Sequence, residues 1–393
     1  MQSNDIIDVL ENKEARTFIR QNIAADTSLL SLKYSSSVGA NFTVWLQLIK
    51  LLAKAKFKLP LFHDKLLALD QRSYEQATSQ LVAAYKSEFI IGDTLLDITG
   101  GLGVDSIFLA DSVAEIIAVE QNEDLHKMAT YNIQTLGIGN ITRCLGDGVS
   151  FLSKKYEWVY IDPDRRPDSG RSVALHLLQP NVLDLMPLLR KFALRAYIKL
   201  SPLFDIEELY RQFIGIETIH VIAQNGEVKE VGVVLNMELS ENSSTIRLRD
   251  VATSFDIHLE KEPKPNWNYI QDDDTYSFVL LPIALVAKTN SAAYFLGKAE
   301  AKKHEAFDIF FSNSEVPEGF RCLKIIEKSN LNAKNIKAML MRLYIQKVNI
   351  SVKGLRDQPS IWHKKLGTTD GGEYYLLILK SKKSEAILTK IFS

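Results

Sequence analysis

Residues 95–103 read Leu-Leu-Asp-Ile-Thr-Gly-Gly-Leu-Gly, and they decide the fold of this 393-residue chain. Apolar residues lead to Asp97, a turn with three glycines comes next (Gly100, Gly101 and Gly103), and residues 104–110 are typical of a helix. Glycines let the backbone approach a ligand closely, and a helix N-terminus offers free N–H groups. The strand, turn and helix together therefore predict a cofactor-binding cradle. The turn alone is a weak signal, and its specificity comes from acidic residues at fixed distances further along the chain.

The composition is that of a globular protein, with 46% hydrophobic and 24% charged residues. The chain is too long for one ordinary core, so we expect about two to four domains. Its longest apolar stretch, residues 278–287, is interrupted by Pro282 and is too short to span a bilayer. The polar N-terminus lacks an export signal, and Cys144 and Cys322 have no partners at metal-binding spacing. These features predict a cytoplasmic protein with free thiols, no metal and no membrane contact.

Charge is distributed unevenly along the chain, although the net charge is only −1. Residues 320–393 contain 15 lysines and arginines against 5 acidic residues, whereas the other 319 residues contain 32 against 43. This asymmetry predicts an acidic body and a basic module that contacts nucleic-acid phosphates. A solvated, lysine-rich surface is the alternative interpretation.

The hydrophobic pattern divides the chain into four parts, which we place at residues 1–90, 91–240, 241–318 and 319–393. The first part is expected to be helical, with apolar residues at helical spacing in 42–49. Ser73 and Gln76 have the spacing of a capping box, which predicts a helix that starts at Ser73 and runs through Tyr85.

Strands and helices alternate in the second part, which predicts a parallel sheet with crossover helices. Asn225-Gly226 is a strong hairpin signal, so the last strand should run antiparallel beside the one before it. The expected strands are 95–98, 116–120, 141–145, 158–162, 196–200, 218–223 and 230–237, with helices at 122–136 and 182–192.

The pattern changes after residue 240. Residues 240–244 are typical of a linker, and residues 245–318 are mixed. In the basic module we expect a helix at 335–343 and strands at 349–352 and 374–379.

Five parallel strands followed by an antiparallel hairpin resemble the class I methyltransferases that use S-adenosylmethionine. The first motif of that family is an acid followed by small residues at every second position, and Asp97, Thr99, Gly101 and Gly103 stand there. Thr99 replaces the commonest residue, glycine, and Gly100 adds flexibility. The resemblance implies a Rossmann-like, seven-stranded α/β sheet whose strand 7 is antiparallel.

Acidic residues come after the first three strands of the expected sheet. Glu120 lies 23 residues after Asp97, where a carboxylate can accept hydrogen bonds from both hydroxyls of a ribose. By resemblance, Asp147 would accept a hydrogen bond from the adenine amino group, and Asp105 is also counted among the cofactor-binding residues. A nicotinamide or flavin site would need glycine at position 106, where Ser106 stands, and the terminal hairpin also disfavours it.

Residues 160–167 read Tyr-Ile-Asp-Pro-Asp-Arg-Arg-Pro and come at the end of the fourth strand. Methyltransferases that modify exocyclic amino groups of bases carry Asp/Asn-Pro-Pro-aromatic there. This chain keeps Asp162 and Pro163 but continues with Asp164 and Arg165. We expect Asp162 to orient and deprotonate an amine, and Arg165 to stack on a base, hold a phosphate or pair with an acid in a loop.

Two further features stay open at this point. Lys199, near the end of the fifth strand, either contacts substrate or only buries its aliphatic stem. Residues 74–76, which precede the sheet, either cover the cofactor or merely start a helix, and the second interpretation is favoured.

From about residue 60 to its end the chain resembles a bacterial family of methyltransferases. That family has a helical N-terminus, a class I core, a small ferredoxin-like segment and a THUMP-like C-terminus, the last two forming a small α+β region. The resemblance implies an RNA substrate (tRNA or rRNA), because THUMP domains bind RNA, and it agrees with the basic module. A small-molecule or protein methyltransferase and an RNA-binding protein with a vestigial core are the alternatives. The resemblance to this family is carried by residues 74–79, 99–105, 161–166, 179–183 and 370–375.

Overall fold

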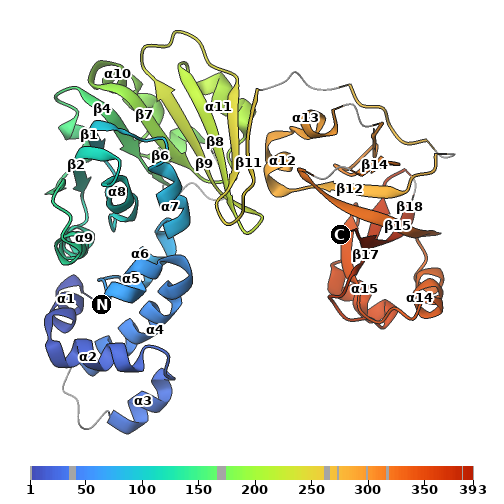
Figure 1. The fold of residues 1–393 in the computed structure, drawn as a ribbon, viewed down its shortest axis with the longest axis horizontal. Helices are drawn as coiled ribbons and strands as arrows, with labels where there is room; N and C mark the ends of the chain where they lie inside the picture. The colour runs from blue at the N-terminus through green and yellow to red at the C-terminus, as the bar shows by residue number, and fades with distance from the viewer. Residues whose placement is uncertain are drawn as a thin grey trace. The chain divides into compact units, whose positions relative to one another are not determined.

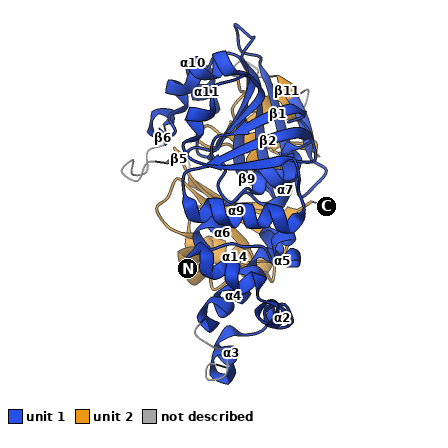
Figure 2. Ribbon diagram, turned by 90° about the vertical axis from the view of Figure 1, so that its left-hand side faces the viewer, with its two compact units in different colours: residues 1–258 blue, residues 259–393 orange. Residues whose placement is uncertain are grey.

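The computed structural model forms two compact units, residues 1–258 and 259–393, and each is described here by itself (Figure 2). No helix among the described residues is long and apolar enough to cross a membrane. The structure describes residues 2–34, 41–165 (only the backbone of Arg165), 174–260, 266–271, 274–297, 300–315, 318–382 and 384–392.

Unit 1 begins with the expected helical region, drawn in blue in Figure 1. In its longest helix, α4 (Phe42–Lys58), residues Trp45, Leu48, Leu52 and Ala55 recur every three or four positions and are buried. This periodicity gives the helix one apolar face, which packs into the core of the unit. The other helices are α1 (Ser3–Glu11), α2 (Lys13–Asn22), α3 (Thr27–Tyr34), α5 (Pro60–Lys65), α6 (Gln71–Gln76) and α7 (Gln80–Lys86).

The helix expected to start at Ser73 is a wrong prediction. Helix α6 begins at Gln71, because Asp70 is its N-cap and accepts a hydrogen bond from the Ser73 N–H at 2.7 Å. The Ser73 hydroxyl in turn accepts a hydrogen bond from the Asp70 N–H at 3.0 Å. Ser73 is therefore the third residue of the capping box rather than its first, and the chain is extended at Ala77 before α7 begins.

The main sheet of unit 1 has nine strands in the order β11-β10-β8-β9-β7-β4-β1-β2-β3. Every strand expected from the sequence is present, and β9 is antiparallel to both of its neighbours, β7 and β8. The sheet continues past the seven expected strands into β10 and β11, which the sequence did not indicate. The strands are β1 (Gly92–Asp97), β2 (Val113–Glu120), β3 (Ile141–Leu145), β4 (Tyr156–Ile161), β7 (Ala193–Leu200), β8 (Ile216–Gln224), β9 (Glu227–Asn236), β10 (Thr245–Asp250) and β11 (Asp256–Glu260).

Crossover helices connect the parallel strands and bury the sheet on both faces, which explains the nearly continuous apolar runs in its central strands. Each helix has local signals for its ends, such as the Asn122 side chain that caps α9 and the left-handed Gly137 that ends it. The crossover helices are α8 (Val104–Leu109), α9 (Glu123–Leu136), α10 (Val182–Phe192) and α11 (Ile206–Gln212).

Unit 2 contains a seven-stranded sheet in the order β13-β14-β12-β15-β18-β17-β16. The expected helix and strands correspond to α14, β16 and β17, whereas the long strands β15 and β18 were not expected. Because β12 pairs with β15, residues on both sides of position 318 belong to one sheet. The elements are β12 (Phe278–Pro282), α12 (Ala284–Thr289), α13 (Ala292–Leu296), β13 (Lys302–Lys303), β14 (Phe310–Ser312), β15 (Phe320–Asn330), α14 (Ala333–Arg342), β16 (Asn349–Lys353), α15 (Pro359–Leu366), β17 (Tyr374–Lys380) and β18 (Ser384–Ile391).

A single buried amide fixes α9 to the N-terminal region. Asn132 is fully buried, accepts a hydrogen bond from the Ala68 N–H at 2.7 Å and donates one to the Ala68 carbonyl at 2.9 Å. Asn132→Ala leaves both Ala68 groups buried without a partner, so we expect the free energy of unfolding to fall by about 2–4 kcal/mol. Urea unfolding followed by circular dichroism measures the change. The exposed Gln134→Ala on the same helix is the control, and an equal effect of both substitutions would contradict this account.

Candidate functional site

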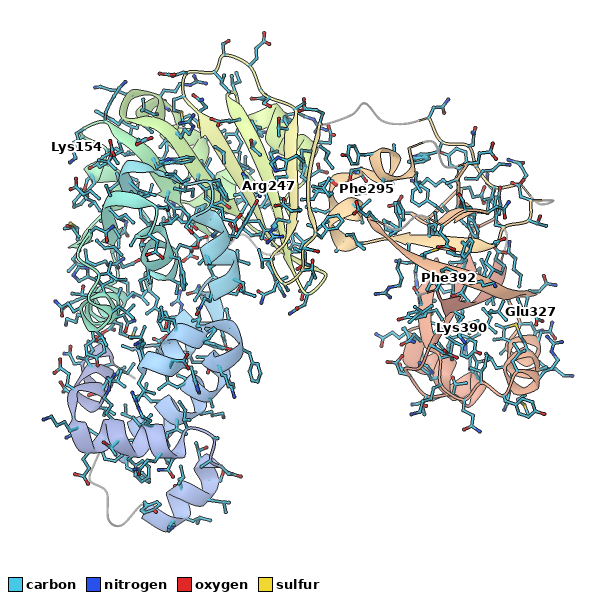
Figure 3. All side chains as sticks on the ribbon, viewed as in Figure 1. Lys154, Arg247, Phe295, Glu327, Lys390 and Phe392 are labelled. Atoms are coloured by element: carbon cyan, nitrogen blue, oxygen red, sulfur yellow. The ribbon has the colours of Figure 1, made fainter. Side chains whose placement is uncertain are left out.

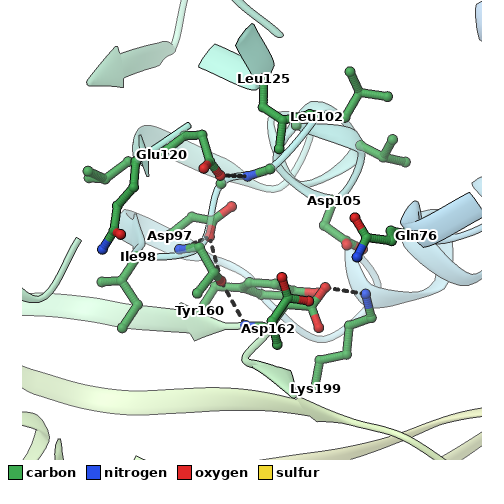
Figure 4. A pocket seen from close by; sticks show the side chains of 18 of the residues that line it. Gln76, Asp97, Ile98, Leu102, Asp105, Glu120, Leu125, Tyr160, Asp162 and Lys199 are labelled. Atoms are coloured by element: carbon green, nitrogen blue, oxygen red, sulfur yellow. Dashed lines mark hydrogen bonds and ion pairs between the residues drawn. The ribbon is translucent and has the colours of Figure 1, made fainter. Parts of the chain in front are cut away.

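A cavity of about 550 Å³ lies where the carboxyl ends of β1, β2, β4 and β7 meet (Figure 4). Parallel strands place their carboxyl ends on one edge of the sheet, so side chains far apart in the sequence converge there. The loops after β1, β2, β3 and β4 line the cavity, together with residues from the end of α6. The structure thus brings together Asp97, Thr99, Gly100, Gly101, Gly103, Asp105, Glu120, Asp147 and Asp162, all expected from the sequence.

Asp97 fixes the turn after β1 from the inside. Its carboxylate is buried and accepts hydrogen bonds from the Thr99 N–H at 3.0 Å and the Ser106 hydroxyl at 2.7 Å. Burial raises the pKa of Asp97 to about 6. Both ends of the turn are therefore tied to one carboxylate.

Thr99 joins the turn to the loop after β4. Its hydroxyl accepts a hydrogen bond from the Asp162 N–H at 2.7 Å, which a glycine at this position could not do. This contact gives a physical reason for threonine where the resembling family most often has glycine. It also couples the expected cofactor cradle to the expected reaction site.

The glycine turn is held in place by Arg143 of β3, which sequence reasoning missed. The Arg143 guanidinium donates hydrogen bonds to the carbonyls of Gly100 at 3.2 Å and Gly101 at 3.0 Å. A Cβ at position 100 would lie 2.4 Å from the Arg143 Nη1 atom, and Gly101 and Gly103 have φ angles of 46° and 83°. The signal available in the sequence was a basic residue in the middle of a short strand.

Glu120 and Asp147 mark the ends of the next two strands. Glu120 accepts hydrogen bonds from the N–H groups of Gly101 and Asn122, both at 2.7 Å. A carboxylate has about four acceptor positions, so Glu120 can bind a ligand while it holds the turn. Asp147 is exposed at the cavity and caps the short helix η1 (Gly148–Phe151).

A buried ion cluster lies behind the cavity. Lys86 of α7 is fully buried, and its ammonium group lies 2.8 Å from Asp105, 2.9 Å from Glu230 and 2.9 Å from the Tyr160 hydroxyl. Burial opposes ionisation of Asp105, but the positive charges of Lys86 and Lys199 outweigh it and hold the pKa of Asp105 at about 2. Asp105 also accepts a hydrogen bond from Thr78 at 2.6 Å, so this carboxylate mainly fixes α7 against α8.

Lys86 was also missed by sequence reasoning. Val82, Ala83 and Lys86 share the buried face of α7, and a lysine on such a face needs an acidic partner. That signal was present, but the sequence alone did not identify Asp105 and Glu230 as its partners.

Asp162 and Lys199 form the other end of the cavity. The Lys199 ammonium group, from β7, is paired with the Asp162 carboxylate, and both side chains line the cavity (Figure 4). Burial lowers the pKa of Lys199, but Asp162, Asp105 and Glu230 raise it more, so the net pKa lies above its usual value. Lys199 thus does more than bury its stem, because it holds the Asp162 side chain in place.

The residues after Asp162 form a short hairpin with a distant segment. Pro163 is buried, and β5 (Asp164–Arg165) pairs antiparallel with β6 (Leu178–Gln179). Burial and the neighbouring Asp162 raise the pKa of Asp164, which lines the cavity. The side chain of Arg165 and residues 166–173 lie outside the described part of the chain.

Residues 74–76 contribute one side chain to the cavity. Gln76 lines it, whereas the Tyr74 hydroxyl donates a hydrogen bond to the Lys54 carbonyl on α4. Among the described residues that line the cavity there are six carboxylates, and Lys199 is the one basic side chain. Such a cavity suits a ligand that carries positive charge.

The chain is similar to one family model, to a relative of similar length and to a solved structure. A family model described as "THUMP domain-like" matches residues 320–390. A protein of Mycobacterium tuberculosis named an uncharacterized S-adenosylmethionine-dependent methyltransferase is 24% identical over 300 residues, which cover 74% of this chain and 78% of that protein. A crystal structure described as a "putative methyltransferase" from Porphyromonas gingivalis W83 is 21% identical and covers both chains completely, with a TM-score of 0.83. The two chains therefore share one fold.

The ion cluster generates a prediction with a defined pH dependence. In Lys86→Met the buried Asp105 and Glu230 lose their cation, so we expect the free energy of unfolding at pH 8 to fall by about 3–5 kcal/mol. In the wild type the lowered pKa of Asp105 contributes stability above pH 3.8, which is lost as the pH falls toward 2. Burial already raises the pKa of Glu230 in the wild type, and loss of Lys86 raises the pKa of both carboxyls further, so the folded variant binds protons more readily and gains stability relative to the wild type on acidification.

The difference between wild type and Lys86→Met should therefore be smaller at pH 5 than at pH 8, as measured by urea unfolding. Lys127→Met, which removes an exposed partner of Glu123, should leave the urea midpoint unchanged at both pH values. A difference independent of pH would refute the assignment of Lys86 as the counter-ion of the two carboxylates.

Proposed function

We propose that this chain, an S-adenosylmethionine-dependent methyltransferase of the class I fold with a THUMP-like C-terminal region, methylates a base nitrogen of an RNA such as a tRNA or rRNA. One observation carries the proposal. The same chain joins an acid-lined cavity at the carboxyl edge of its parallel sheet to a strongly basic module at residues 320–393.

The residues of the cavity fit the cofactor in shape and charge. Glu120 would accept hydrogen bonds from the ribose hydroxyls, and Asp147 would accept one from the adenine amino group. The turn at Gly100 and Gly101 has no side chains, and Arg143 keeps its backbone close to the cavity. When bound, S-adenosylmethionine supplies an electrophilic methyl group on a positively charged sulfur, which the excess of carboxylates favours.

Asp162 is our candidate for the residue that handles the acceptor. Lys199 occupies one carboxylate oxygen, and the other can accept a hydrogen bond from an amino group and so orient its lone pair. The same oxygen can take the proton that the amine must lose. We assign Pro163 to shaping this loop, and Arg165 to contacting the acceptor base or its phosphate.

The charge of unit 2 supports RNA as the substrate. Every described lysine and arginine of residues 320–392 is exposed except Lys390, which is half-buried. Most have no carboxylate partner among the described residues, and the ion pairs present are exposed ones such as Lys365–Asp357. Unpaired surface cations gain free energy when they displace counterions from a phosphate backbone.

The assignment of Glu120 can be tested without knowing the acceptor. In Glu120→Ala the ribose loses its acceptor and the Gly101 N–H loses its partner, so affinity for S-adenosylhomocysteine should fall at least about 100-fold. Isothermal titration calorimetry measures the change. Glu123→Ala, on the exposed face of α9 and outside the cavity, is the matched control. Unchanged binding by Glu120→Ala would remove Glu120 from the cofactor site.

The RNA substrate is tested by transfer of tritium from labelled S-adenosylmethionine to fractionated RNA. The RNA comes from a strain that lacks this gene, and RNA from the wild-type strain is the already-modified control. We expect label only in one RNA class of the deletion strain, and about 100-fold slower labelling by Asp162→Asn, which keeps its cofactor affinity. Absence of label in every fraction, with cofactor binding intact, would contradict RNA as substrate and favour a protein or small-molecule acceptor.

A further inference from the structure

Unit 2 contains a bulky residue whose backbone is left-handed and whose side chain is exposed. Burial therefore does not offset the strain of this backbone conformation. In the described part of the chain, four residues other than glycine have a positive φ angle: Leu66, Asn225, Asn290 and Tyr344. Asparagine tolerates this conformation, and Leu66 is only 1% exposed, so core packing stabilises it. Tyr344 has a φ angle of 56° and is 93% exposed, so packing does not offset its strain.

Tyr344 occupies a position where helices normally have glycine. The Tyr344 N–H donates a hydrogen bond to the Met341 carbonyl at 3.1 Å, and the Ile345 N–H donates one to the Leu340 carbonyl at 2.9 Å. These two bonds are the Schellman motif that ends α14, and its left-handed residue is most often glycine. Glycine would make the same hydrogen bonds without strain, so the fold itself gives no reason for a tyrosine here.

Tyr344 follows the end of α14, and the exposed side of that helix carries two lysines and a methionine. Lys334, Lys337 and Met341 recur at intervals of three and four residues, so they lie on one face of the helix. Met341 is 67% exposed, whereas Ile336 and Leu340 on the other face are buried. We call Lys334, Lys337, Met341 and Tyr344 the α14 face.

The cations of this face are available to a ligand. Lys334 and Lys337 have no acidic partner among the described residues, in contrast to Arg342, which is paired with Glu327 of β15. Glu327 lies beside α14 in Figure 3. The end of α14 thus has an exposed aromatic ring shortly after the exposed Met341, and the same helix carries two lysines without an acidic partner among the described residues.

We propose that the α14 face binds a single-stranded RNA segment, with the Tyr344 ring stacked on an unpaired base and with Lys337 and Lys334 contacting phosphates further along the same strand. The inference rests on the proposed function and goes beyond it, because it identifies which surface of the basic module binds RNA and states that the bound RNA is single-stranded. Base faces are accessible only in single strands, loops and ends, whereas a duplex hides them. Stacking on a tyrosine therefore selects an unpaired segment, and the lysines add affinity that depends on salt.

The test is binding of the full-length chain to a fluorescein-labelled 12-nucleotide oligoadenylate, measured by fluorescence anisotropy at low salt. In Tyr344→Gly we expect about 5–150-fold weaker binding, as for the loss of one stacked base. The same variant should unfold at a higher temperature, because glycine relieves the strained φ angle. Tyr344→Phe keeps the ring and should bind within about twofold of wild type. Asn290→Gly, at the left-handed end of α12 in the same unit, should leave RNA binding unchanged.

The other outcomes overturn the inference in distinguishable ways. Equal binding by wild type and Tyr344→Gly would refute the α14 face while the proposed RNA substrate still stands. A lower unfolding temperature for Tyr344→Gly would show that the tyrosine stabilises the fold. If Tyr344→Gly sediments differently from the wild type in the absence of RNA, the α14 face is a contact between two copies of the chain. No binding of the wild type to oligoadenylate or to bulk tRNA would overturn both the α14 face and the proposed RNA substrate.

Discussion

The buried ammonium group of Lys86 is the contact on which the arrangement of unit 1 depends. It joins α7 to α8 through Asp105, to β9 through Glu230 and to β4 through Tyr160. Two carboxylates could not both stay ionised at this depth without a cation. The N-terminal helices are therefore not a separate appendage, because their last turn supplies the charge that lets the sheet and its first crossover helix pack behind the cavity.

The acids at the cavity consequently divide into two kinds. Asp97 and Asp105 make their hydrogen bonds inward, to the turn and to neighbouring helices, and they set the shape of the cavity. Glu120, Asp147 and Asp162 line the cavity and retain acceptor positions beyond their hydrogen bonds within the protein. A carboxylate next to a glycine turn thus need not touch the cofactor, and its hydrogen-bond partners distinguish the two roles.

Much of the fold could be predicted from the sequence because its strands are buried on both faces and appear as apolar runs between turn signals. Strand β10 was missed because its alternating pattern comes after a serine-rich segment that is typical of a linker, and only pairing with β8 makes it a strand. Side chains that line the cavity could be predicted where they follow the ends of strands at local spacing, as at Asp97, Glu120 and Asp162. Arg143 and Lys86 act through contacts that close only in the folded chain, so spacing along the sequence could not assign their partners.

The hydrogen bond from the Asp162 N–H to the Thr99 hydroxyl has a thermodynamic consequence. It ties the glycine turn, which we propose faces the cofactor, to the loop that we propose faces the acceptor. A ligand that shifts Thr99 must either shift the backbone of Asp162 as well or weaken this hydrogen bond, and the reverse holds equally. Coupling free energies are reciprocal, so any effect that occupancy of one half of the cavity has on the affinity of the other half must be matched by the same factor in the reverse direction.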